Sequence, residues 1–158
     1  MLRATLLALA AASAVTMPAF ANGLSAKQVV ERATVSVDVD GNEVRSYALA
    51  EEVAPGDEVR YSLSYANTGD EPAEAVSLVM PVPGEVTYIE SSVRGAANTV
   101  SFSADGGKSF SGRATVATGE GDEARPASAD DITHIKWVFS EPVAPSSVGT
   151  VSFSAVLK

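Results

Sequence analysis

Along most of the chain, hydrophobic residues alternate with polar ones, which places every second side chain on one face of an extended strand. Between residues 58 and 65 the apolar positions are Val59, Tyr61, Leu63 and Tyr65, separated by Arg60, Ser62 and Ser64. The same alternation recurs at Val35–Val39, Val100–Phe102, Ile135–Phe139 and Val151–Leu157. A period of two predicts β-strands with one buried face, not helices.

Turn-forming residues separate these segments roughly every 10 residues, a rhythm typical of antiparallel β-sandwiches. The turns are Asp40-Gly41-Asn42, Pro55-Gly56-Asp57, Asn67-Thr68-Gly69-Asp70, Pro81-Val82-Pro83-Gly84 and Asp105-Gly106-Gly107. The predicted strands are Val29–Val39, Glu43–Val53, Asp57–Ala66, Ala75–Met80, Val86–Val93, Thr99–Ala104, Phe110–Val116, Ile132–Ser140 and Gly149–Leu157. We therefore predict an all-β fold, an Ig-like antiparallel β-sandwich of seven to nine strands.

Two segments depart from the strand pattern. Ser25–Ala33 is the one stretch compatible with a short helix, whereas Ala117–Asp131 has no large apolar residue and is rich in Gly, Glu, Asp, Ala and Ser. The second segment is predicted to be a long mobile loop or a hairpin tip. Trp137 is predicted to be the central core aromatic, surrounded by Tyr61, Leu63, Phe102 and Phe153.

Residues 1–21 have the pattern of a secretory signal peptide. Arg3 supplies a positive charge, Leu6–Val15 is small and apolar, Pro18 breaks the helix, and Ala19-Phe20-Ala21 matches a signal-peptidase site. A transmembrane anchor is the alternative, but the apolar run is shorter than the roughly 20 residues that a span requires. We predict cleavage after Ala21, a single domain over residues 22–158, and a periplasmic or extracellular location.

The composition restricts the available chemistry. The chain has 158 residues, 46% of them hydrophobic, no cysteine, and a net charge of −9. The absence of cysteine excludes disulfides, thiol nucleophiles and cysteine metal ligands. The acidic balance argues against a nucleic-acid partner, because phosphate binding needs clustered Lys and Arg.

Residues from about 51 to 157 resemble a repeat of bacterial surface proteins, the DUF11 type. The resemblance is carried by Val53-Ala54-Pro55-Gly56-Asp57, the alternating strand to Tyr65, Asn67-Thr68-Gly69, Pro72-Ala73, Val76, Leu78, Pro81-Val82-Pro83, Val86-Thr87-Tyr88 and Ser103–Phe110. It implies an Ig-like sandwich and no catalytic residues. Family members often form tandem copies in long surface proteins, whereas this chain carries one copy.

No group of residues forms a recognisable reactive site. His134 is the only histidine, and the alternation places it opposite Ile135 as an exposed strand residue. There is no Gly-x-Ser-x-Gly motif for a Ser-His-Asp site. One histidine without cysteine cannot build a conventional zinc site. We predict no catalytic, cofactor-binding or metal-binding residues, no cofactor, and no enzymatic activity.

Two acidic groups are candidates for weak calcium binding. Asp38, Asp40, Asn42 and Glu43 are similar to the start of a calcium loop, but Ala48–Ala50 do not supply the later Glu, and a β-turn explains them equally well. The second group is Glu120, Asp122, Glu123, Asp130 and Asp131. Solvated charge is the simpler interpretation of both groups.

The leading functional hypothesis is an exported, non-enzymatic β-sandwich that acts as a structural or interaction module of the cell envelope or extracellular space. Its partner would be an envelope or extracellular protein or glycan, contacted through loops such as Ala117–Asp131. The alternatives are a carbohydrate- or calcium-binding module and, less favoured, a hydrolase. If the last strand, Val151–Leu157, lies at a sheet edge, it could also pair with another subunit, although an ordinary paired strand is favoured.

Overall fold

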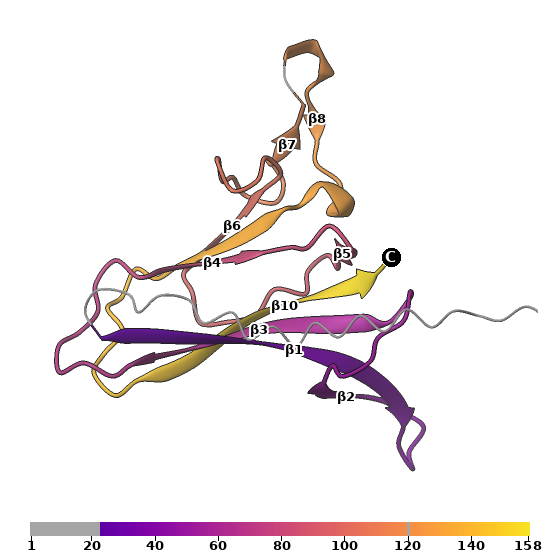
Figure 1. Cartoon of the computed structure of the whole chain (residues 1–158), viewed down its shortest axis with the longest axis horizontal. Helices are drawn as coiled ribbons and strands as arrows, with labels where there is room; N and C mark the ends of the chain where they lie inside the picture. Colours follow the sequence, from indigo (N-terminus) through magenta and orange to yellow (C-terminus); the bar gives the residue numbers. More distant parts are fainter. Residues whose placement is uncertain (1–22, 120) are drawn as a thin grey trace, which may run out of the picture.

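The computed structural model describes residues 23–119 and 121–158, and they fold into an all-β sandwich of antiparallel sheets (Figure 1). The predicted signal peptide lies outside the described residues. The main strands are β1 (Leu24–Val37), β2 (Glu43–Leu49), β3 (Glu58–Asn67), β4 (Ser77–Pro81), β5 (Val86–Tyr88), β6 (Thr99–Ser103), β9 (His134–Val138) and β10 (Val148–Leu157). The short elements are β7 (Ala117–Thr118), β8 (Arg125–Pro126) and the 3-10 turns η1 (Gly121–Glu123) and η2 (Ala129–Asp131).

The larger sheet has five strands in the order β2-β1-β3-β10-β5. Its centre is β3, which pairs along its length with β1 on one side and β10 on the other. In β3, Val59, Leu63 and Tyr65 are buried toward the second sheet, as the alternation predicts. Tyr61 is half-buried, and its ring stacks on that of Phe153.

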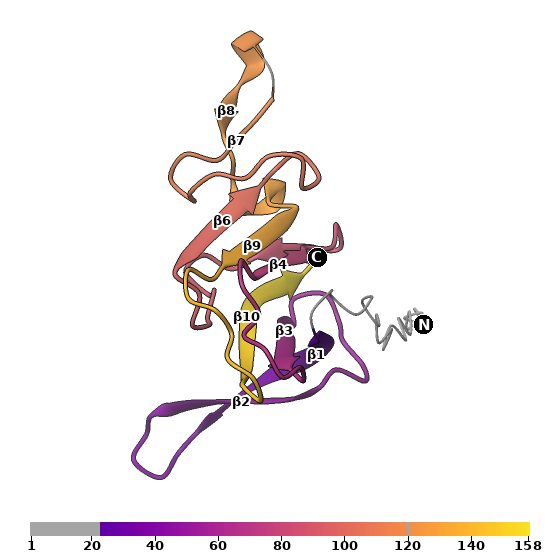
Figure 2. The same cartoon turned by 90° about the vertical axis from the view of Figure 1, so that its left-hand side faces the viewer.

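The smaller sheet has three strands in the order β4-β9-β6 and covers the core face of the larger one (Figure 2). Trp137, at the middle of β9, is fully buried, with Leu78 and Val100 opposite it on the flanking strands. Leu63 and Phe153 approach the core from the larger sheet and are also buried. The prediction of Trp137 as the central core aromatic is confirmed.

The predicted strand Val29–Val39 falls within β1 over most of its length, and the alternative of a short helix at 25–33 is wrong, because residues 25–32 pair with β3 and residue 33 with β2. One predicted strand is wrong. Residues 110–116 do not form a strand beyond one bridge between Ser111 and Phe102, because the backbone turns back on itself: the amides of Thr115 and Val116 donate to the carbonyl of Gly112. The Asp105-Gly106-Gly107 turn exists as predicted, and both glycines have positive φ.

The predicted strand Val86–Val93 is too long. Pairing with β10 ends at Tyr88, because the chain then turns: the amide of Ser92 donates to the carbonyl of Ile89, and Ser91 has a φ of 60°. Backbone pairing with β10 resumes at one position, where Arg94 bridges to Ser152. This segment therefore runs beside β10 without extending the ladder.

The alternative in which the last strand forms a free edge is wrong. β10 lies inside the larger sheet, between β3 and β5, and Val151, Phe153 and Ala155 are fully buried. The edge strands of this sheet are instead β5, which has three residues, and β2. The exposed long edge belongs to the β1–β2 hairpin.

The outer half of the β1–β2 hairpin extends beyond the sandwich as an arm (Figure 2). β1 pairs with β3 only as far as Arg32, whereas its pairing with β2 continues to Val37. The stripe at Val35, Val37 and Val39 was expected to be buried, yet these residues are 50%, 67% and 102% exposed. Val35 and Val37 lie on the outer face of the larger sheet, together with Glu31 and Arg60, and no second sheet covers that face among the described residues.

Candidate interaction site

The segment predicted as a loop or hairpin tip, residues 117–131, forms a projecting hairpin (Figure 1). Ala117 and Thr118 of β7 pair with Pro126 and Arg125 of β8. The turn between them contains η1, and Gly119 is required there, because a Cβ at this position would lie 2.5 Å from the carbonyl oxygen of Glu123. A hairpin isolated from a sheet is marginally stable in water, so its base needs additional contacts.

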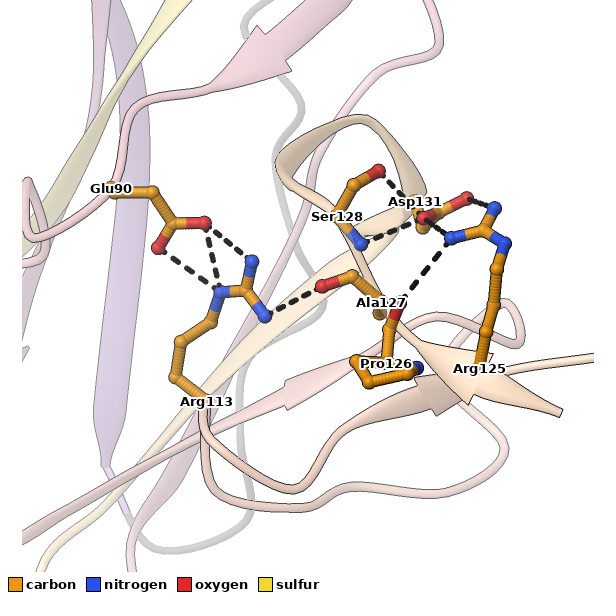
Figure 3. Close-up of polar contacts among 7 residues, drawn as sticks. All are labelled: Glu90, Arg113, Arg125, Pro126, Ala127, Ser128 and Asp131. Carbon is orange, nitrogen blue, oxygen red and sulfur yellow. Dashed lines mark hydrogen bonds and ion pairs between the residues drawn. The ribbon is translucent and has the colours of Figure 1, made fainter.

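Arg113 provides the first of these contacts (Figure 3). Its guanidinium donates to both carboxylate oxygens of Glu90 and, through Nη1 at 2.8 Å, to the carbonyl of Ala127. Ala127 and Val116 are buried beneath the hairpin and linked by a backbone hydrogen bond. One side chain therefore ties the returning strand of the hairpin to the segment that follows β5.

Asp131 provides the second contact (Figure 3). Its carboxylate accepts two hydrogen bonds from the guanidinium of Arg125, at 2.7 and 2.9 Å, and two from Ser128, through the amide and the hydroxyl. The Arg125 guanidinium, followed by the Ser128 donors, holds the pKa of Asp131 well below its usual range. A bidentate pair of this kind fixes the orientation of both groups.

The segment that follows β8, η2, also contacts the edge strand of the larger sheet, β5. Asp130 accepts a hydrogen bond from the Thr87 hydroxyl of β5 and lies 3.1 Å from the Lys158 Nζ. These two donors lower the pKa of Asp130. The acids at positions 130 and 131 are therefore engaged in contacts within the chain, whereas Asp122 and Glu123 at the tip are exposed.

The Asp131 contacts predict that the base of the hairpin loosens in acid. A carboxyl group whose pKa is lowered by folding stabilises the folded state above its unfolded value, here 3.8, and that contribution is lost as the pH falls further. We expect hydrogen–deuterium exchange of amides 116–131 to quicken below about pH 4 relative to the β3 amides. Asp131→Asn should exchange quickly already at neutral pH and show a weaker pH dependence, which comes from Asp130.

Asp122→Asn is the matched control, because it removes an acidic charge from the same hairpin without touching the Asp131 contacts. In the Asp122→Asn variant, amides 116–131 should exchange at the same rates, and with the same pH dependence, as in the unsubstituted chain. Equal exchange rates in the Asp131→Asn variant and the unsubstituted chain at neutral pH would contradict a fixing role for this carboxylate.

His134 lies at the start of β9 and is half-buried, not fully exposed as predicted. Its ring packs against Gly107, and its Nδ1 lies 3.2 Å from the Thr133 Oγ1. That oxygen already donates to the carbonyl of Ser103 and accepts from the amide of Gly106. The polar contact of His134 therefore belongs to a set of hydrogen bonds between the residue that precedes β9, Thr133, and the turn that follows β6.

The first acidic group forms a hairpin turn. One carboxylate oxygen of Asp38 accepts hydrogen bonds from the amides of Asp40 and Asn42, and the other accepts from the Asn42 side chain. The Asn42 amide is the main cause of the lowered pKa of Asp38. Among the described residues, no three His, Asp or Glu side chains converge in a way that could hold a metal ion.

A polar pocket of about 270 Å³ lies on the outer face of the larger sheet. It is lined by arginine, glutamate, tyrosine and serine side chains from four segments: Arg45, Tyr47, Glu58, Arg60, Glu90, Arg94, Ser152 and Ser154. The Arg60 guanidinium lies 3.6 Å above the Tyr47 ring and pairs with Glu31 at 2.8 Å. The sequence gives no signal for the arginines, because they come from segments far apart along the chain.

The comparisons with known proteins add no relatives. No protein-family model, curated protein or solved structure matches this chain. The DUF11-type resemblance therefore stays a prediction from the residues. No helix in the described part of the chain is both long and apolar enough to cross a membrane.

Proposed function

We propose that this chain is an exported, non-enzymatic β-sandwich that acts as a structural or interaction module of the cell envelope or the extracellular space. The observation that carries the proposal is the hairpin of residues 117–131, which projects from the sandwich on a base fixed by two arginine–carboxylate contacts. Holding a surface hairpin in one conformation lowers the entropy that a partner must remove on binding.

Three further features support this function. The residue pattern of 1–21 is that of a secretory signal, and the DUF11-type resemblance implies a surface protein. The hairpin tip exposes Asp122 and Glu123, so it suits a partner surface that is locally basic. Loops held on a rigid scaffold are where binding residues concentrate in many sandwich proteins.

A site-specific crosslinking experiment tests the role of the hairpin. The chain has no cysteine, so a single introduced cysteine can be labelled with a thiol-reactive photo-crosslinker. Ala124→Cys places the label on the exposed hairpin tip, and Ser64→Cys places it on the exposed outer face of the larger sheet. In envelope and culture-medium fractions, we expect the Ala124 position to give a discrete crosslinked product that the Ser64 position does not. Identical products from both positions, or none from either, would refute the hairpin as the contact surface.

The second candidate is a carbohydrate-binding module, favoured by the polar pocket on the outer face. Its volume is below the roughly 300 Å³ of the smallest drug-sized sites, which suits a single sugar ring. Arg94 carries a charge that can attract an acidic sugar, whereas Arg45 is paired with Glu58, and the Ser154 hydroxyl can form a hydrogen bond with the sugar.

Thermal melting distinguishes this candidate from the first. A uronate-containing oligosaccharide at 100 times its dissociation constant would stabilise the folded chain by about 2.7 kcal/mol and raise the melting midpoint. Arg94→Ala should abolish that rise, whereas Asp122→Asn on the hairpin should leave it unchanged. A midpoint that does not move with acidic glycans or millimolar calcium would remove the ligand-binding alternatives.

A further inference from the structure

The β2 strand offers a free, regular edge for strand pairing. It has seven residues without proline or glycine and, within residues 23–119 and 121–158, pairs with β1 alone and is the outermost strand of its sheet. An exposed edge of this kind is a template for another strand unless it is blocked by proline, a bulge or like charges. β2 carries one acid, Glu43, and one base, Arg45, so the edge is neutral although the whole chain carries −9.

The hydrogen-bonding groups that β2 leaves free can be assigned residue by residue. At the two ends of the hairpin, the amide of Ala50 donates to the carbonyl of Val30, and the amide of Asp38 donates to the carbonyl of Asn42. Because antiparallel pairing alternates along a strand, the even-numbered residues of β2 direct their backbone groups toward β1. The odd-numbered residues, Glu43, Arg45, Tyr47 and Leu49, direct theirs outward.

We propose that β2 pairs antiparallel with β2 of a second copy of this chain, about a two-fold axis at Ser46. This register sets Glu43 opposite Leu49, Val44 opposite Ala48 and Arg45 opposite Tyr47 of the other copy. All the outward backbone groups are then paired, and the two five-stranded sheets become one continuous sheet. The interface is isologous, so it closes at two copies and leaves no β2 edge free.

Side-chain chemistry favours this register over its neighbours. A shift of the pairing by two residues in one direction sets Arg45 against its own copy, where the two positive charges repel. A shift in the other direction sets Glu43 opposite Glu51, which lies beyond the end of β2, so the ladder is shorter and two acids face each other. In the proposed register each Arg45 lies beside an aromatic ring, Tyr47, and the exposed side chains of Val44 and Leu49 gain cross-strand neighbours.

Disulfide formation tests the register directly. Even-numbered residues form the non-hydrogen-bonded pairs across the proposed interface, where opposite Cα atoms lie about 4.5 Å apart, within the range that a disulfide spans. Ser46→Cys should therefore give a covalent dimer of the full chain under mild oxidation. Val44→Cys is the matched control, because its two copies lie four residues apart along the pairing and cannot reach each other.

A second pair of variants tests the edge without cysteine. The amide of Arg45 points outward, so Arg45→Pro blocks the ladder between copies while sparing the hydrogen bonds to β1. Arg45→Ala removes the same side chain, including its contact with Glu58, and keeps the amide. In sedimentation equilibrium we expect dimers, with a dissociation constant about tenfold or more higher for Arg45→Pro than for Arg45→Ala.

Either of two results would overturn the proposal. One is a single monomeric species across the micromolar range for the unsubstituted chain. The other is equal crosslinking of the Ser46→Cys and Val44→Cys variants, or dimers that Arg45→Pro leaves unchanged, which would place any contact elsewhere. A thermal melt of Arg45→Pro close to that of Arg45→Ala confirms that the sandwich itself is intact.

Discussion

Replacing Trp137 with alanine is expected to lower the free energy of unfolding by about 3–5 kcal/mol, the range for large-to-small changes of buried aromatic residues. Trp137 is fully buried in the central strand of the smaller sheet and belongs to the same core cluster as Leu63 and Phe153 of the larger sheet. Because domains of this size are stable by only about 5–15 kcal/mol in total, one such change removes a large fraction.

Trp137→Phe separates the packing of this residue from its polar group. The indole Nε1 is buried and has no hydrogen-bond partner among the described residues. Phenylalanine keeps an aromatic ring, leaves a smaller cavity and removes a donor that is unsatisfied. We therefore expect a cost of about 1–2 kcal/mol, well below that of Trp137→Ala.

Urea unfolding followed by circular dichroism measures both changes. Tryptophan fluorescence cannot be used for these variants, because the chain has one tryptophan. The unfolding midpoint should fall without a change in the slope of the free energy against urea, since the surface exposed on unfolding is nearly the same. Equal costs for Trp137→Phe and Trp137→Ala would contradict the view that ring packing dominates the contribution of this residue.

Strands with one buried face and one polar face were predictable from the sequence. The predicted ranges for β3, β9 and β10 overlap the observed strands, because burial of one face selects a period of two and sets the register against the neighbours. The segment at 25–33 shows the limit of this signal. Its residues favour a helix locally, but pairing along β3 satisfies their backbone groups and outweighs that local preference.

Alternation alone does not say which face of a sheet is covered. Val35 and Val37 lie on the same face as Glu31 and Arg60, because Glu31 pairs with Arg60, whereas the smaller sheet covers the opposite face, that of Val59 and Leu63. Val39 lies in the turn beyond the end of β1. The exposed arm, and the free β2 edge that it carries, could therefore be found only in the structure.

The candidate site was predictable as a segment but not as an ordered hairpin. Its composition, without large apolar residues, indicated a surface loop. Its order depends on Arg113 and Arg125, whose partners Glu90 and Asp131 lie at separations that have no sequence signature. The arginines of the outer-face pocket were missed for the same reason, since cross-strand register brings them together.

At the C-terminal end of β3, Asn67 connects three segments through its side chain. The residue is 1% exposed, and its Nδ2 donates to the carbonyls of Glu71 and Val143, both at 2.8 Å. Its Oδ1 accepts from the amide of Gly69 at 3.0 Å. The sequence identified Asn67 as a turn residue, but the contact with Val143, 76 positions away, shows that it also holds the loop before β10.

Asn67→Asp keeps the size of this side chain but replaces its hydrogen-bond donor, the Nδ2 amide group, with an accepting oxygen. The introduced carboxylate cannot donate, so it would face two carbonyl oxygens in a buried site. We expect a loss of about 3–5 kcal/mol in the free energy of unfolding at pH 7, the range for an unpaired buried charge. Asn67→Ala also removes the hydrogen bonds but adds no charge, so it should lower the free energy of unfolding by roughly 1–3 kcal/mol.

The two variants should also differ in their dependence on pH. Burial and the facing carbonyls raise the pKa of the introduced carboxyl above its unfolded value of about 3.9, because they penalise the charged form. The deficit of Asn67→Asp should therefore be largest above the raised pKa and shrink as the pH falls toward 4, where the neutral acid can donate to one carbonyl. Asn67→Ala should show a deficit independent of pH. Urea unfolding at several pH values measures both, and a pH-independent deficit for Asn67→Asp would mean that this side chain does not donate to the carbonyls of Glu71 and Val143.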